Sequence, residues 1–502
     1  MRKNRLLRCL SATLLCAVFL LPACGTGSRA YTVTYTAGEG GTLVGECEQK
    51  ILRRKDAEQV TAVADVGYRF VGWDDGVSEA VRTDTDIVAN AAYTAVFEPD
   101  YLDLPAIRID TEENAAIVSK EDYVNCGVSV LNADEAYNFS GASAKIRGRG
   151  NSSWFNMPKK SYKLKFSEKT DLFGNGKAKT WTLIANYCDP SLARNYFALS
   201  LGAQFPSLQQ TTSTTQFVDL YLNGRYDGVY LVCEQNEVGK TRVDIDEDVD
   251  DVDTGYLLEM DVRIEGEELI DYFALEDYRF GRKCYQLKSP DPEDIADAGK
   301  YPQSFISYIG LYTSDCLNAI VFEDFERVCD LIDVDSFAES YIVNELFNAQ
   351  DVGDSSFFLY KKKGGKLYCG PIWDYDISTG NCNYYSSFYT EHGSWEYDCL
   401  WAKELNVWYY YLTGRSEFCE IVGRKLAEYE TKIRETIDAC AQSLYANERT
   451  FVRNFKRWDV LGKPNWPNPI ELQQIKTWKN HVKYVRNWLL ASLEFVKSQY
   501  PI

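Results

Sequence analysis

Histidine is nearly absent from this chain, which has only His392 and His481 among its 502 residues. The two lie far apart, and neither belongs to an HExxH motif or a Cys/His cluster. A histidine-ligated zinc site or a Ser-His-Asp triad needs such arrangements, so the sequence argues against both. Any chemistry must therefore be carried by carboxylates, lysines and arginines.

The chain also lacks a CxxC pair, an excess of positive charge and, beyond its first residues, any run of 18 apolar residues. Without CxxC pairs, zinc-ribbon and thioredoxin-like sites are excluded. The formal net charge of -20 repels nucleic acid, so we expect no nucleic-acid partner. To bind an anionic ligand such as ATP, so acidic a protein needs a local basic pocket or a divalent cation.

Apolar and aromatic residues are abundant, at 45% and 14% of the chain. This composition is typical of a globular protein, and the length indicates two or three domains. Twelve cysteines from Cys47 to Cys440 are spread through the chain. Their spacing leaves open whether they form disulfides or remain buried free thiols.

The first 30 residues predict export. Four positive charges precede an apolar run from Leu10 to Leu21, and Leu-Pro-Ala-Cys then fits a lipobox. We expect a lipoprotein signal peptide at 1–23, lipidation of Cys24 and a flexible linker at 24–30. The protein would then be extracytoplasmic and lipid-anchored to the bacterial cell membrane, which would be one of its partners.

Residues 31–99 predict a small all-β module, because alternating apolar stretches are separated by glycine-rich turns. The set AGEGGTLVG, GYRFVGWDDG and YTAVFEP resembles a divergent internalin-type B-repeat. This resemblance implies an extracellular spacer or adhesive unit without catalytic chemistry.

The rest of the chain predicts an α+β domain. Strand-like and helical patterns alternate over 101–400, and helical stripes dominate 401–502. We interpret the second range as a helical C-terminal part of the same domain.

A basic, glycine-punctuated hairpin is the first candidate binding element. It carries Arg149, followed by Lys160, Lys163 and Lys165, and its glycines would let the backbone approach a ligand closely. Tyr162, Leu164 and Phe166 would share one face of its second strand, and Lys163 and Lys165 the other. From the residues alone, a solvated strand face is about as good an explanation.

A second hairpin, with an Asn-Gly turn, ends at Glu234. This carboxylate would pair with a lysine of the first hairpin, as a lysine–glutamate pair does in protein kinases, or lie free on the surface.

Two acidic loops joined by a short hairpin are the sharpest signal. The first carries Asp351, and the second carries Asp374 and Asp376 and closes at Asn381. In phosphoryl transfer one aspartate orients and deprotonates a hydroxyl, and another holds Mg²⁺ against the phosphates. On an extended backbone Asp374 and Asp376 would project to the same side and reach one metal. Two acidic surface turns are the alternative.

In order along the chain, RGNSSW…KKSYKLKF, LYLNGRYDGVYLVCE, GYLLEMD and QDVGDSSFFLYKKKGGKLYCGPIWDYDISTGN resemble the CotH family of kinase-like spore-coat proteins. The resemblance implies an atypical protein-kinase-like fold that binds ATP and Mg²⁺ and phosphorylates Ser or Thr of secreted or surface proteins. It implies that Asp351 is the catalytic aspartate and that Asp374 binds metal, with Asp376 and Asn381 in support. A lysine of the first hairpin, Lys160, Lys163 or Lys165, would hold phosphate.

One stretch departs from the kinase pattern: Ser355 and Ser356 occupy the place where a metal-binding asparagine normally follows the catalytic aspartate. A catalytically inactive scaffold or adhesin on the cell surface is therefore the alternative to an active kinase. A polysaccharide-binding or processing protein is a third interpretation, based on aromatic content and paired carboxylates. We expect the protein to be a monomer.

Overall fold

The structure, a computed structural model, describes residues 29–264, 271–383 and 397–502. The described residues form two compact units, one of residues 29–65 and 69–98 and the other of 66–68 and 99–502.

The predicted signal peptide, the lipidation site Cys24 and most of the linker lie outside the described residues, and they stay predictions. The twelve cysteines from Cys47 to Cys440 are all free thiols, and most of them are buried.

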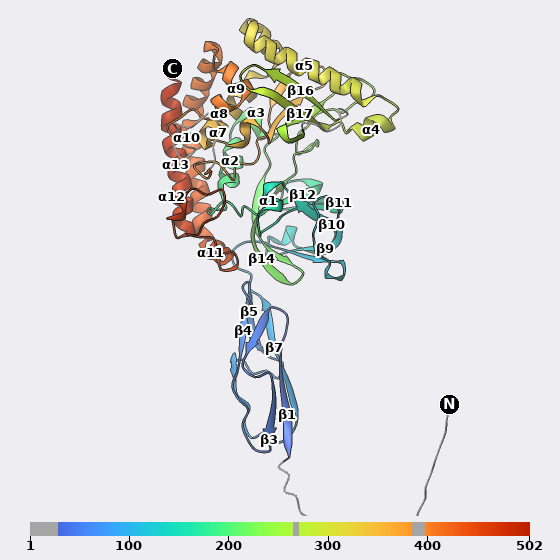
Figure 1. Cartoon of the computed structure of the whole chain (residues 1–502), viewed down its shortest axis with the longest axis vertical. Coiled ribbons are helices and arrows are strands. Elements are labelled where there is room, and N and C mark those ends of the chain that lie inside the picture. The colour runs from blue at the N-terminus through green and yellow to red at the C-terminus, as the bar shows by residue number, and fades with distance from the viewer. Residues whose placement is uncertain (1–28, 265–270, 384–396) are drawn as a thin grey trace, which may run out of the picture. The chain divides into compact units, whose positions relative to one another are not determined.

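The first unit is all-β, as the sequence predicts (Figure 1). A four-stranded sheet has the order β3-β1-β7-β5, with β1 and β7 parallel, and a three-stranded sheet has the order β2-β4-β6. Val33, Tyr35 and Trp73 are buried in its core. The strands are β1 Ala30–Ala37, β2 Gly41–Val44, β3 Glu48–Leu52, β4 Val60–Ala64, β5 Tyr68–Trp73, β6 Val81–Arg82 and β7 Ala91–Pro99.

The second unit begins with a closed barrel in the order β10-β11-β12-β14-β13-β8-β9. A parallel pairing of β13 with β8 closes the barrel, and the other pairs are antiparallel. Alternate apolar side chains, among them Leu164, Trp181 and Val218, fill its interior. The strands are β8 Ala106–Thr111, β9 Val124–Leu131, β10 Phe139–Arg149, β11 Ser161–Asp171, β12 Lys177–Ile184, β13 Thr215–Leu222 and β14 Arg225–Glu234.

A five-stranded antiparallel sheet, in the order β16-β17-β15-β18-β19, follows the barrel. The helices α10 and α13 pack against each other and against α7, while α5 packs on β16 (Figure 1). The strands are β15 Tyr256–Met260, β16 Tyr272–Asp277, β17 Gly281–Ser289, β18 Phe357–Lys361 and β19 Leu367–Cys369. The helices are α1 Ser152–Phe155, α2 Arg194–Gly202, α3 Pro206–Gln209, α4 Pro292–Asp297, α5 Pro302–Phe322, α6 Phe325–Leu331, α7 Val334–Phe347, α8 Ala402–Leu405, α9 Val407–Leu412, α10 Ser416–Ala446, α11 Glu448–Arg457, α12 Ile470–Gln473 and α13 Trp478–Gln499.

Helix α7 is the central helix of this unit, and from Ser336 to Phe347 every side chain is buried. The Asp333 carboxylate caps its first turn by accepting a hydrogen bond from the Ser336 N–H at 2.9 Å. Asn348, in the left-handed conformation with φ 46°, ends the helix. Both ends of α7 are therefore fixed by local chemistry, and the chain leaves it directly into the first acidic loop.

Helix α5 is long and apolar enough to span a membrane by length and composition alone. However, 44% of its most apolar window is buried inside the unit, with Phe305, Ile309 and Ile320 among the inward-facing side chains. Packing in the core therefore accounts for much of its apolar character.

Candidate active site

The first acidic loop starts where α7 ends. Asp351 begins a single 3-10 turn, Asp351–Gly353, and its carbonyl accepts hydrogen bonds from the N–H groups of Asp354 and Ser355, both at 2.9 Å. These bonds hold the turn closed and leave the Asp351 side chain at the rim of a hollow.

The second acidic loop follows β19 through Gly370 and Pro371. Asp374 has a φ of 66°, so the backbone there is left-handed, and the expectation of an extended backbone from Asp374 to Asp376 is wrong. The chain turns after Tyr375, whose carbonyl accepts hydrogen bonds from the Ser378 N–H and hydroxyl at 3.2 and 2.6 Å. The alternation of side chains along an extended strand therefore gives no reason to place the two aspartates on one face.

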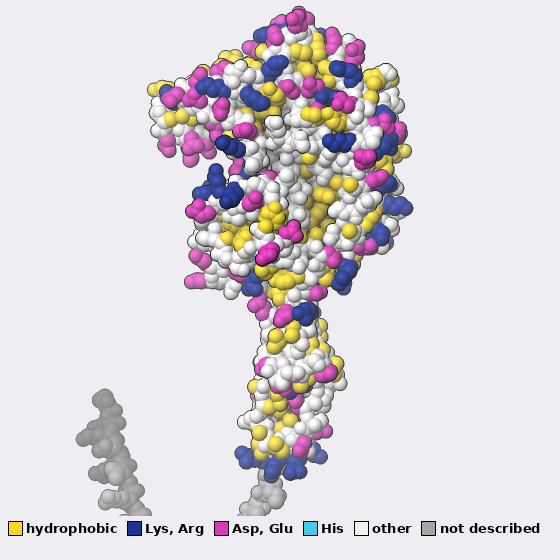
Figure 2. Space-filling model, turned by 180° about the vertical axis from the view of Figure 1, so that it is seen from behind, with side chains coloured by type: hydrophobic (Ala, Val, Ile, Leu, Met, Phe, Trp, Pro, Cys, Tyr) yellow, Lys and Arg dark blue, Asp and Glu magenta, His cyan; other side chains and the backbone are white. Residues whose placement is uncertain are grey.

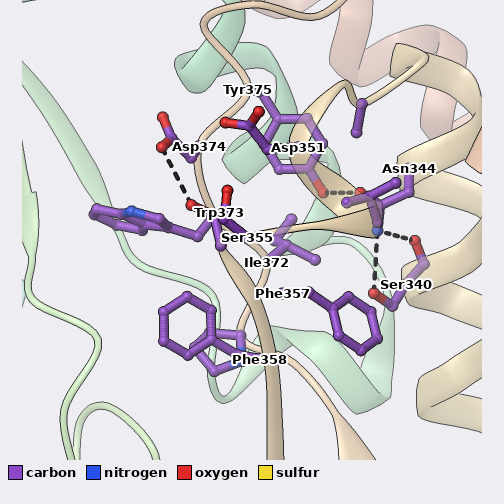
Figure 3. Close-up of a pocket in the computed structure, with 14 residues that line it drawn as sticks. Ser340, Asn344, Asp351, Ser355, Phe357, Phe358, Ile372, Trp373, Asp374 and Tyr375 are labelled. Atoms are coloured by element: carbon purple, nitrogen blue, oxygen red, sulfur yellow. Dashed lines mark hydrogen bonds between the residues drawn. The ribbon is translucent and has the colours of Figure 1, made fainter. Parts of the chain in front are cut away.

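A small, partly open hollow lies between the two loops. Asp351 and Asp374 both line it, together with Trp373 and the buried side chains of α7 and β18. Figure 3 shows the carboxyl groups of Asp351 and Asp374 on the same side of this hollow, with Trp373 extending away from it. The structure thus brings together the two aspartates that the sequence places in different loops.

Mutual repulsion and burial determine the electrostatics of this site. Burial raises the pKa of Asp351 above its usual range, and the negative charge of Asp374 raises it further, while Arg263 acts in the opposite direction. Burial and Asp374 likewise raise the pKa of Asp376. A cation placed among these carboxylates would relieve the repulsion.

Asp376 is half-buried, and its carboxylate accepts a hydrogen bond from the Cys188 thiol at 3.2 Å. It does not line the hollow that contains Asp351 and Asp374.

Asn381 is buried, and its carboxamide forms hydrogen bonds with protein groups through both its nitrogen and its oxygen. The amide donates to the carbonyls of Cys188 and Asp376 at 3.0 and 2.7 Å, and its oxygen accepts from Asn468 at 2.6 Å. In this geometry Asn381 closes the loop, and a direct role for it in metal binding stays a prediction.

Ser355 and Ser356, which occupy the place of the second metal ligand of kinases, both line the hollow. The Ser356 hydroxyl donates to the Asp374 carboxylate at 3.3 Å, and Ser356 itself has a φ of 55°. Ser356 therefore orients the predicted metal-binding aspartate.

On the barrel side, β10 and β11 form the predicted basic pair of strands, although α1 lengthens their connection beyond a tight turn. Tyr162, Leu164 and Phe166 point into the barrel core, as predicted. Lys163 lies on the outer face and is half-buried, and among the described residues its ammonium group has no hydrogen-bond or ion-pair partner.

Lys163 has three positive neighbours and one negative neighbour, Glu237. Its pKa is lowered to about 8, first by burial and then by the nearby charge of Arg147; Glu237 raises it, and Arg149 and Lys288 lower it to a smaller extent. The Arg149 guanidinium lies 4.8 Å from the centre of the Trp373 ring. Trp373 directly precedes Asp374 in the sequence. Figure 2 shows Lys and Arg side chains gathered at a notch beside the barrel. A basic face of the barrel thus meets the acidic loops.

The other predicted phosphate ligands differ in their surroundings. The Lys160 ammonium donates to the Trp154 carbonyl within the connection after β10, and Lys165 is exposed. Of the three candidate lysines, the geometry therefore favours Lys163.

Glu234 is buried at the end of β14 and accepts a hydrogen bond from the Thr214 hydroxyl at 2.8 Å. Burial raises its pKa, and the nearby cation that lowers it is Arg242 rather than a lysine. Among the residues that the structure describes, Glu234 therefore forms no pair with a lysine, and it does not lie free on the surface either.

Sequence reasoning missed two charged residues around the site. Arg263, which is ion-paired to Asp261 at 2.7 Å, contributes positive charge near Asp351. Lys283 binds Asp354 at 2.8 Å and the Gly353 carbonyl at 2.7 Å, so it fixes the first loop. Both come from strands or loops remote in sequence, and only three-dimensional pairing reveals them.

Two protein families match parts of this chain. The divergent InlB B-repeat domain matches residues 31–101, and no curated protein matches the chain. The CotH kinase protein family matches residues 146–496, a range that includes both acidic loops, the basic strands and the C-terminal helices. The chain therefore belongs to the CotH kinase protein family.

Proposed function

We propose that this protein is an atypical kinase that transfers phosphate from ATP to Ser or Thr of secreted or surface proteins. The observation that carries the proposal is the meeting of two aspartates from separate loops with a basic strand face. Arg149 links the two sides through its contact with Trp373. Such a pairing of opposite charges suits a metal–nucleotide complex.

The site suits Mg²⁺ only when phosphate completes the coordination. Among the described residues no three His, Cys, Asp or Glu side chains come together as a metal cage. Mg²⁺ is commonly held by one or two carboxylates, with water and phosphate oxygens supplying the other ligands. We assign Asp374 as the principal ligand, with Asp376 behind it, and bound Mg²⁺ would neutralise charge on the phosphates.

Asp351 would act as the general base. Its raised pKa makes it a better proton acceptor than an ordinary aspartate, while Arg263 favours its ionised form. Its carboxylate would accept the proton of the substrate hydroxyl as the oxygen attacks phosphorus. Lys163 and Arg149 would hold the phosphates from the barrel side.

The substrate and location are part of the same proposal. A leader with a lipobox supports anchoring of the protein through Cys24 to the outside of the bacterial membrane, where its protein substrates would also lie. We further propose a monomer that binds no nucleic acid.

A non-catalytic scaffold or adhesin is the second candidate. Ser356 favours it, because a serine replaces the usual second metal ligand and its hydroxyl is bonded to Asp374. Binding and phosphate transfer must therefore be measured separately.

Calorimetry of ATP binding to residues 29–502, with and without Mg²⁺, tests the proposal. We expect Mg²⁺-dependent binding that Asp374→Ala abolishes. Asp351→Asn should keep binding but lose transfer of labelled phosphate to protein by at least 100-fold. Asp354→Asn is the matched control, because Lys283 already holds this nearby carboxylate outside the hollow.

The absence of ATP binding by the wild-type protein at millimolar concentration would overturn the kinase proposal. Binding without phosphate transfer to any protein would favour the scaffold.

A further inference from the structure

The Arg194-Asn195 pair at the start of α2 has no role in the function proposed above, although both side chains are buried. Arg194 is completely buried and ion-paired to Asp189, which is equally buried. Asp189 also accepts hydrogen bonds from the N–H groups of Ala193 and Arg194 at 2.9 and 2.8 Å. The ion pair therefore has a fixed orientation at the beginning of the helix.

The same guanidinium reaches the second acidic loop. Its Nε donates to the Ser378 carbonyl at 2.9 Å and to the Thr379 hydroxyl at 2.7 Å. One of its terminal nitrogens lies 3.3 Å from the Thr379 carbonyl. A single side chain thus ties Asp189 and the start of α2 to the loop segment that follows Asp376.

Asn195 contacts the same loop between its two aspartates. Its carboxamide oxygen accepts a hydrogen bond from the Tyr375 N–H at 2.7 Å, and its amide donates to the side chain of Asn186 at 2.9 Å. Tyr375 directly follows Asp374 and precedes Asp376. Consecutive residues of α2 therefore hold the loop at two points around Asp376.

These contacts indicate that Arg194 and Asn195 fix the position of the second acidic loop. A buried ion pair contributes little net stability, because the desolvation of two charges offsets much of their attraction. It does fix geometry, since the planar guanidinium forms several directed hydrogen bonds at once. Within the described part of the chain, Glu234 accepts a hydrogen bond from Thr214 and has Arg242 as its nearby cation, so it does not form the lysine–glutamate pair of protein kinases.

We propose that Arg194 and Asn195 are positioning residues that set the second acidic loop from the start of α2, and so determine the affinity of its aspartates for metal–nucleotide. The inference rests on the proposed function. It also makes α2 a point at which a partner or a conformational change would alter metal affinity, because any displacement of its first turn moves the loop.

Arg194→Lys tests the inference with a matched control, Arg453→Lys. Arg453 is also buried, paired to Asp219 at 2.5 Å and bonded to a backbone carbonyl, but it lies between α11 and the barrel. Lysine keeps the charge in both places and loses the planar fork. We expect similar losses of melting temperature, whereas only Arg194→Lys should weaken Mn²⁺–ATP binding, measured by electron paramagnetic resonance, about tenfold or more.

Asn195→Ala provides a second variant without a change of charge. It removes the acceptor for the Tyr375 N–H, and we expect weaker Mn²⁺–ATP binding together with recovery of kcat at high Mn²⁺. Such recovery separates mispositioning from a general loss of folded protein.

Wild-type Mn²⁺–ATP affinity in both Arg194→Lys and Asn195→Ala would overturn the positioning role and leave the proposed function intact. Equally weak Mn²⁺–ATP binding in Arg453→Lys would also overturn the positioning role, because the loss of affinity would then follow from reduced stability alone. Failure of the wild-type protein to bind Mn²⁺–ATP would instead overturn the proposed function, and this inference with it.

Discussion

At the scale of single residues, the environment of each side chain separates groups that look alike in sequence. Lys159 and Lys163 both belong to the same basic stretch. Lys159 is buried against the Ala185 carbonyl at 2.9 Å and the Asn454 carboxamide at 3.2 Å, so it is a structural group. Lys163 lacks such partners among the described residues and has positive neighbours, so it has charge available for a ligand.

The lowered pKa of Lys163 predicts that ATP binding depends on pH. The ammonium form exists below its pKa of about 8 and is lost as the pH rises through that value. The dissociation constant for Mg²⁺–ATP should therefore increase between pH 8 and 9.5, by calorimetry. Lys163→Arg should remove this dependence, because arginine stays charged. An unchanged pH profile in the arginine variant would show that another group titrates.

His481 predicts a different pH effect, on folding. The residue is buried, and burial lowers its pKa to about 4, against the usual 6.5. Between these values the unfolded chain binds a proton that the folded chain does not, so the free energy of unfolding falls as the pH falls from 6.5 to 4. The slope contributed is at most about 1.4 kcal/mol per pH unit. In urea titrations, His481→Gln should flatten the profile in that window, and parallel profiles would contradict the prediction.

At the scale of elements, the sequence predicts what local patterns determine. The strands β15 and β18 coincide with apolar runs of the sequence that are bounded by turn residues. The hairpin of β13 and β14 turns at Asn223 and Gly224, whose φ values of 48° and 70° suit an Asn-Gly turn. In α10, apolar residues recur every three or four positions, as expected for the helical range 401–502, and they are buried: Phe418, Val422, Leu426, Ile433 and Ile437.

Long-range pairing was beyond sequence reasoning. The closure of the barrel depends on β8 lying beside β13, about a hundred residues later, and no local pattern encodes that parallel contact. The pairing of Asp351 with Asp374 was predictable from two motifs and a hairpin, whereas the left-handed backbone at Asp374 and the Arg194 contacts were not. Positive φ at a non-glycine residue is imposed by surrounding contacts.

The caps of α6 and α7 give a prediction at this scale. Asp324 and Asp333 each accept a hydrogen bond of 2.9 Å from the N–H three residues later. Alanine at either position should lower the free energy of unfolding by about 1 kcal/mol. Urea denaturation measures the loss. Serine, which retains a capping oxygen, should restore most of it, and equal losses in the alanine and serine variants would argue against capping.

At the scale of the whole molecule, the two units have separate cores and should respond separately to mutation. Arg82 is buried in the first unit, where it binds Asp75 at 2.7 Å and Asp84 at 2.8 Å and lies over the Tyr93 ring. The second unit contains the complete candidate site.

We therefore expect Arg82→Ala to destabilise the first unit by about 1–3 kcal/mol, because a buried side chain and its ion pairs to two partly exposed carboxylates are lost. In calorimetry of residues 29–502 one of two transitions should shift to lower temperature. Mg²⁺–ATP affinity should stay within twofold of wild type. A shift of both transitions together would show that the units unfold as one.

The contacts that C-terminal residues make with the second acidic loop and the segment before α2 have a consequence for protein synthesis. Asn468 donates to the Asn381 carboxamide and to the Cys188 carbonyl, both at 2.6 Å, and Trp478 donates to the Ser191 carbonyl at 2.8 Å. A ribosome delivers these residues well after the aspartates they help to place, because translation runs from the N-terminus. When both acidic loops of a nascent chain have left the ribosome, these contacts cannot yet form. The site is therefore complete only after Asn468 and Trp478 have been synthesised.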